Sequence, residues 1–109
     1  MTGSPFLFVR HPEAEDELDS AIDWYDAFNP GQGERLLDMV EVSERAIDEM
    51  PEAWAVFPGW RRRSPIVRSH RLAKFPYRIV YYVKDDRIII LAYAHTSRKP
   101  GYWRHLVNW

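Results

Sequence analysis

The chain has 109 residues, the size of one domain, and 46% of them are hydrophobic, which is enough to form a core without covalent cross-links. It contains no cysteine, which excludes disulfide bonds and thiolate metal sites, and no apolar run approaches the roughly 20 residues of a membrane span. Residues 1–5 lack the basic and long apolar regions of a signal peptide. We therefore expect a cytoplasmic protein in which residues 1–109 form one domain.

The net charge of −1 conceals a strong asymmetry between the two halves of the chain. Residues 1–55 carry 14 Asp or Glu and three Lys or Arg, whereas residues 56–109 carry two acids and 12 Lys or Arg, so the halves have charges of −11 and +10. One interpretation is that the halves attract each other within the fold. We favour a polyanionic or acidic partner for the basic half, because arginines on one face of a sheet have few helix carboxylates within reach.

The first elements are a strand and a helix. Residues 6–10 are a short apolar run typical of a strand, and His11-Pro12-Glu13 is expected to begin a helix, since proline is tolerated in a first turn. Trp24 lies beside the apolar stripe of this helix. The stripe recurs at helical spacing and consists of Ala14, Leu18, Ala21, Ile22, Tyr25 and Phe28.

A second helix is expected to follow directly, with Asn29 as its cap, Pro30 in its first position and Pro51 at its end. The short connector predicts an antiparallel helical hairpin that covers the sheet. The predicted buried face of the second helix consists of Leu36, Val40, Ser43, Ile47 and Met50.

The second half of the chain predicts three strands. Residues 51–65 contain three prolines and are expected to be irregular, with Trp54, Phe57 and Trp60 against the core, and a third strand is expected at about residues 66–73. Residues 77–83 and 88–94 flank a polar connector and predict a hairpin whose second arm is apolar on both faces, as in an inner strand. The predicted fold class is α+β, in the order β-α-α-β-β-β, with an N-terminal helical hairpin packed on a mainly antiparallel four-stranded sheet.

Four motifs, in this order, resemble the RelE/ParE superfamily of type II toxins. They span residues 11–18, 21–25, 75–81 and 94–103, and the resemblance covers about residues 6–104. It implies a small growth-inhibiting toxin made beside a cognate antitoxin that wraps it and represses their shared operon. We expect no cofactor, no metal and no small-molecule ligand.

The superfamily divides by target. RelE-like members cut mRNA on the ribosome, whereas ParE-like members poison DNA gyrase. The blocks at residues 75–81 and 98–103 are more similar to the ParE-named side, so the resemblance implies a toxin that acts on gyrase by binding. The alternatives are a ribosome-dependent mRNA endonuclease and an inactive toxin-like partner module.

The endonuclease alternative requires a base, an acid and cations in a basic groove. Its candidate catalytic residues are Arg71, Arg78, His95 and Tyr102. His95 lies where the last strand is expected to end, and Tyr102 falls at about the place of a functional tyrosine in RelE-like nucleases. The structural alternatives are a hydrogen-bonding role for His95 and, for Tyr102 with Trp103, a plug for the open end of the core.

The remaining candidates are expected to bind the target or the antitoxin. An acidic antitoxin segment is expected to cross residues 61–71, and an exposed sheet edge invites addition of a partner strand. The alternatives are a solvated arginine patch and a core role for the aromatic residues. The candidates are Arg61, Arg62, Arg63, Arg68, Lys74 and Arg98, with apolar anchors near Trp24, Tyr25 and Trp54.

Overall fold

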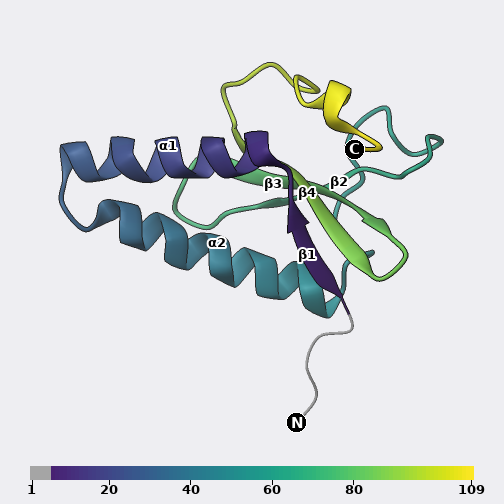
Figure 1. The fold of residues 1–109 in the computed structure, drawn as a ribbon, viewed down its shortest axis with the longest axis horizontal. Helices are drawn as coiled ribbons and strands as arrows, with labels where there is room; N and C mark the ends of the chain where they lie inside the picture. The colour runs from purple at the N-terminus through teal and green to yellow at the C-terminus, as the bar shows by residue number, and fades with distance from the viewer. Residues whose placement is uncertain (1–5) are drawn as a thin grey trace, which may run out of the picture.

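The computed structural model describes residues 6–109 and has the predicted order of elements (Figure 1). Residues 1–5, in which the sequence predicts no signal peptide, lie outside the described residues. The elements are β1 (Leu7–Arg10), α1 (Pro12–Phe28), α2 (Gln32–Glu49), β2 (Arg68–Arg71), β3 (Tyr77–Lys84), β4 (Arg87–His95) and a short 3-10 helix, η1 (Arg104–Leu106).

The four strands form one sheet in the order β1-β4-β3-β2. β1 runs parallel to β4, and the other neighbouring pairs are antiparallel, which confirms the predicted mainly antiparallel α+β fold. β4 is an inner strand and is buried from Ile88 to Ala94. The predicted hairpin of the last two strands is therefore confirmed.

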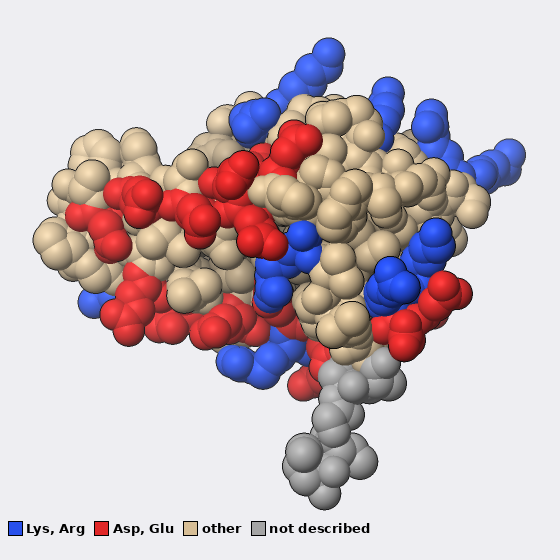
Figure 2. Space-filling model, viewed as in Figure 1, with Lys and Arg blue, Asp and Glu red and all other residues tan. Residues whose placement is uncertain are grey.

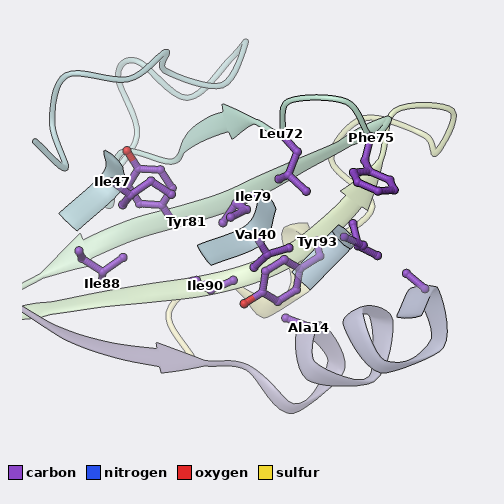
Figure 3. Packing of buried hydrophobic residues seen from close by; sticks show 12 residues of the cluster. Ala14, Val40, Ile47, Leu72, Phe75, Ile79, Tyr81, Ile88, Ile90 and Tyr93 are labelled. Carbon is purple, nitrogen blue, oxygen red and sulfur yellow. The ribbon is translucent and has the colours of Figure 1, made fainter. Parts of the chain in front are cut away.

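Each face of the sheet has its own hydrophobic core. On one face the helical hairpin lays Leu36, Val40 and Ile47 against Ile79 and Tyr81, together with apolar residues of β4 (Figure 3). On the other face, Trp60 and Trp103 cover Val80, Tyr82 and Leu91. The irregular segment and the C-terminal segment thus supply the second cover that an inner apolar strand requires.

The start of α1 was predicted correctly, but the turn between the helices was not. His11 is the N-cap of α1, and its Nδ1 accepts the backbone N–H of Glu13 at 3.0 Å. Asn29 is the C-cap of α1 rather than the cap of α2, which begins at Gln32 after Gly31. A carboxylate from the preceding helix takes the capping role, because Asp26 Oδ1 accepts the N–H groups of Gly31 and Gly33 at 3.2 and 2.8 Å.

Three further predictions are corrected at the ends of elements. Phe28 and Met50 are 74% and 62% exposed, because Phe28 ends α1 at the hairpin turn and Met50 follows the last residue of α2 (Figure 1). The third strand is shorter than predicted and covers only Arg68–Arg71. Beyond it the chain turns through Lys74, which has a positive φ of 69°.

A β-bulge in β4 decides which side chains face the helices. Val80 pairs with Ala92, whereas Tyr81 pairs with Ile90, so Leu91 is an extra residue in β4. Leu91 and Ala92 both pack in the core away from the helices. Tyr93 consequently lies on the helix face, which simple alternation along the strand would not predict (Figure 3).

Candidate functional site

A hollow of about 550 Å³ opens between α1 and the end of β4, within the usual range for ligand pockets. The bulge contributes to it, since it turns Tyr93 and His95 toward α1. The lining residues are Asp16, Glu17, Ser20, Ala21, Trp24 and Tyr25 from α1, Tyr77, Tyr93 and His95 from the sheet, and Arg98.

Aromatic rings follow one another along this side of the molecule. The ring of Trp24 lies 4.6 Å from that of Phe28 and 5.0 Å from that of Tyr25, centroid to centroid. Tyr25 lies 6.4 Å from Tyr77, which in turn lies 5.1 Å from His95. Trp24 is 57% exposed, so it is not a core residue, whereas Tyr25 is half-buried.

Glu17 joins α1 to β4 and to the C-terminal segment. Its Oε1 accepts the backbone N–H of Tyr93 at 3.1 Å, and its Oε2 accepts the hydroxyl of Tyr102. Burial raises the pKa of Glu17, and burial together with the Glu17 carboxylate raises the pKa of Tyr102. Glu17 was not predicted as a site residue. Its place four residues before Ala21, in the predicted apolar stripe, was a signal that its side chain faces the sheet.

The geometry of His95 fixes its neutral tautomer. Its Nδ1 accepts the backbone N–H of Ser97 at 3.0 Å and lies 2.7 Å from Ser97 Oγ. Because a backbone N–H can only donate, Nδ1 carries a lone pair, and neutral His95 has its proton on Nε2. His95 therefore offers a donor beside Tyr77.

Two arginines lie directly opposite each other on the other face of the sheet. Arg71 of β2 pairs with Arg78 of β3, and both are exposed. Arg78 lies between Tyr77 and Ile79, which pack on the helix side, so the two arginines point away from the helices. Like charges directly opposite each other destabilise a strand pair, and an anionic partner would remove this repulsion.

Three of the four predicted catalytic residues line one small hollow, and the fourth, Arg71, lies outside it. Arg71 and Arg78 lie on one face, while His95 packs against Tyr77 and the Tyr102 hydroxyl donates to Glu17 on the helix side. The small hollow has a volume of about 70 Å³ and is lined by Arg78, His95 and Tyr102, but not by Arg71.

The other predicted binding residues occupy several places. Arg61, Arg62 and Arg63 are exposed in the irregular segment, with the Arg63 guanidinium 4.7 Å from the centroid of the Trp60 ring. Lys74 is exposed in the turn before β3, and the Arg98 guanidinium lies 3.9 Å from the centroid of the Tyr102 ring.

Arg68 and Trp54 have structural contacts. Arg68 donates to the Trp54 carbonyl at 2.8 Å, and the Trp54 indole donates to the Ala46 carbonyl at 3.1 Å. Trp54 also packs edge-on against His70, with ring centroids 4.4 Å apart. These two residues fix the irregular segment to α2 and β2.

Charge is distributed unevenly over the surface. Figure 2 shows acidic side chains along both helices, whereas Lys and Arg gather mainly at the end formed by the irregular and C-terminal segments. Within residues 6–109, no helix is long and apolar enough to cross a membrane. In the same part of the chain, no group of three or more His, Asp or Glu could hold a metal ion.

Residues 8–100 match the protein family described as the ParE toxin of the type II toxin-antitoxin system parDE. The chain belongs to the ParE toxin family. It is therefore a toxin of a type II toxin–antitoxin system, as its motifs indicated.

A solved structure carries the same ParE fold. A chain of the "Chromosomal ParDE TA system from P. aeruginosa" superposes with a TM-score of 0.70 at 19% identity, over 87% of this chain and 100% of that one. No curated protein sequence matches the chain.

Proposed function

We propose that this ParE-family toxin inhibits growth by binding DNA gyrase in the cytoplasm, and that a cognate antitoxin neutralises it. The observation that carries the choice of binding over catalysis is the Tyr102 hydroxyl, which donates its hydrogen to Glu17 and so does not serve as the general acid. A general base, an acid and cations have to meet at one phosphate to cleave RNA. Binding has no such requirement.

The Arg71–Arg78 pair is the proposed contact with gyrase or with the DNA that gyrase holds. Both arginines are exposed and directly opposed, and no carboxylate within residues 6–109 lies within 4 Å of either guanidinium. An acidic protein surface or a DNA phosphate supplies the missing negative charge.

The test combines a gyrase supercoiling assay and a ribosomal A-site mRNA cleavage assay with the same purified toxin. Linear DNA trapped with gyrase, with intact mRNA, supports the proposal. The double variant Arg71→Gln/Arg78→Gln should trap at least tenfold less DNA, whereas the control Arg35→Gln/Arg45→Gln, which removes two exposed charges on α2, should match the wild type.

Two results would reject the gyrase proposal. Cut mRNA would favour the endonuclease alternative, because the Arg71–Arg78 pair also suits an RNA phosphate. Inactivity in both assays would favour an inactive partner module.

The antitoxin is proposed to place an acidic segment on Arg61, Arg62 and Arg63. These side chains are exposed and consecutive, and within the described chain no ion pair engages them. The variant Arg61→Ser/Arg62→Ser/Arg63→Ser should weaken antitoxin binding by at least tenfold in calorimetry. The control Arg35→Ser/Arg45→Ser/Arg87→Ser removes the same charge elsewhere, and equal affinity of the two variants would refute this contact.

A further inference from the structure

The exposed aromatic pair on α1 lies beside the hollow and within acidic surroundings. Trp24 and Phe28 are 57% and 74% exposed, and their ring centroids are 4.6 Å apart. Adjacent exposed aromatic residues mark interaction surfaces, and tryptophan is enriched among the residues that dominate binding energy. The pair is therefore a candidate anchor for a protein partner.

The charges that line the hollow leave a net negative rim. Arg98 lies 3.8 Å from Glu17, whose two carboxylate oxygens already accept hydrogen bonds from Tyr93 and Tyr102. These two opposite charges largely cancel. Asp16 remains exposed on the rim, and Asp23 follows two helical turns later on the same face of α1.

The combination of an indole face, a phenol and an uncancelled carboxylate suits a cation. Tryptophan binds cations best among the aromatic side chains. Asp16 lines the same hollow about two helical turns, or roughly 12 Å, before Trp24, so a long basic side chain is needed to reach both. The Nε2–H of His95 offers a donor to a carbonyl of an arriving peptide. A carboxylate that entered the same hollow would be repelled by Asp16.

We propose that this hollow receives an arginine or lysine side chain of the antitoxin, with its aliphatic stem along Trp24 and its charged end paired with Asp16. The identity of the protein that supplies the cation rests on the proposed function. The antitoxin then needs basic residues for the hollow beside α1 and acidic residues for Arg61–Arg63. The charges of the antitoxin would then be separated along its chain and complementary to those of the toxin.

The first test uses the full-length toxin alone, in an NMR titration with N-acetyl-arginine amide that follows the Trp24 indole N–H. N-acetyl-citrulline amide is the matched probe, since it has nearly the same shape without the charge. The arginine probe should shift the Trp24 signal with at least fivefold higher affinity than the citrulline probe. Asp16→Asn should remove this preference, and Asp19→Asn, on the same helix but outside the hollow, should retain it.

The second test measures antitoxin affinity by calorimetry. Asp16→Asn and Trp24→Ala should each weaken binding at least tenfold, and Asp19→Asn should stay within twofold of the wild type. Trp24 is exposed, so its loss should leave the dispersion of the NMR spectrum intact.

Several outcomes would overturn the proposal. These are equal binding of the arginine and citrulline probes, tighter binding of N-acetyl-glutamate amide, or antitoxin affinities that Asp16→Asn and Asp19→Asn change equally. Gyrase takes no part in either test, so failure of the gyrase assay and failure of this proposal are separate results.

Discussion

At the scale of single residues, Gly33 shows how one backbone position sets the distance between the two helices. Gly33 is buried in α2, and a Cβ built there would lie 2.7 Å from the Ile22 carbonyl oxygen of α1 and 2.7 Å from Asp26 Oδ2. Helix propensity alone would favour alanine by about 1 kcal/mol. We expect Gly33→Ala to destabilise the protein by about 1–3 kcal/mol instead, because the helices must move apart.

Urea unfolding followed by circular dichroism checks this expectation. The control is Arg35→Ala, an exposed position in the same helix, which should change the free energy of unfolding by less than about 0.5 kcal/mol. An alanine at position 33 that stabilises the protein would show that the helix contact is not tight.

His70 is expected to make stability depend on pH. Its Nδ1 lies 3.1 Å from Ser43 Oγ, and burial lowers its pKa from the ordinary 6.5. The unfolded chain therefore binds the His70 proton more readily than the folded chain as the pH falls through 6.5. The contribution of neutral His70 to stability is present above that pH and is lost below it.

The measurement is the free energy of unfolding of the wild type and of His70→Gln at pH 7.5 and pH 5.5. Glutamine keeps a polar group near Ser43 and does not titrate. The wild type should lose more stability than the variant between the two pH values. Equal losses, or a larger loss in the variant, would contradict the assignment.

At the scale of elements, one polar network connects β1, β4 and α2. Arg10 donates through Nε to the Tyr93 hydroxyl at 2.9 Å and through a terminal nitrogen to Glu44 Oε1 at 2.5 Å. The Tyr93 hydroxyl donates to Glu44 Oε2 at 2.7 Å. The carboxylate of Glu44 thus accepts from both partners on its two oxygens.

Replacing Glu44 by glutamine should cost about 1–3 kcal/mol, because the part-buried Arg10 loses its counter-charge. Chemical denaturation of Glu44→Gln measures the loss. Glu41→Gln, an exposed neighbour on the same helix, is the control and should be near neutral. Equal stability of the two variants would mean that the network is not a source of stability.

The elements themselves were largely predictable from local patterns. The hairpin of β3 and β4 was predicted to within a residue or so, because its arms are β-branched and aromatic and its connector is polar. The turn between the helices was not, because Asp26 caps α2 from the preceding helix. A contact between two helices leaves no periodic signal in the sequence.

The candidate site was predictable only in part. Trp24, Tyr25, His95 and Arg98 were named in advance from motifs and charge, and the structure brings them to one hollow. Tyr93 was missed, since the bulge at Leu91 turns it to the helix face. A bulge depends on how two strands pair, and the alternation of residues along one strand does not reveal it.

At the scale of the whole molecule, the two oppositely charged halves do not neutralise each other. Within residues 6–109, the arginine–carboxylate pairs are Arg10–Glu44 and Arg98–Glu17. Most of the basic side chains therefore remain available to partners, which argues against simple attraction between the halves (Figure 2). Such a surface steers oppositely charged partners during encounter.

Association with the antitoxin should accordingly depend on salt. Raising the salt concentration from about 50 to about 500 mM should slow association roughly tenfold or more, because the Debye length shortens. Stopped-flow mixing measures this rate, and Arg61→Ser/Arg62→Ser/Arg63→Ser should flatten its salt dependence. An association rate that does not change with salt concentration would show that electrostatic steering is absent.

The extra residue in β4 affects how ParE homologues should be compared. Deleting Leu91 would keep every residue that lines the hollow. It would nevertheless turn the side chains of Tyr93 and His95 to the opposite face of the sheet. Strand length, rather than the identity of the lining residues, then determines whether a homologue possesses the hollow. Alignments that allow a gap within β4 would conceal this difference.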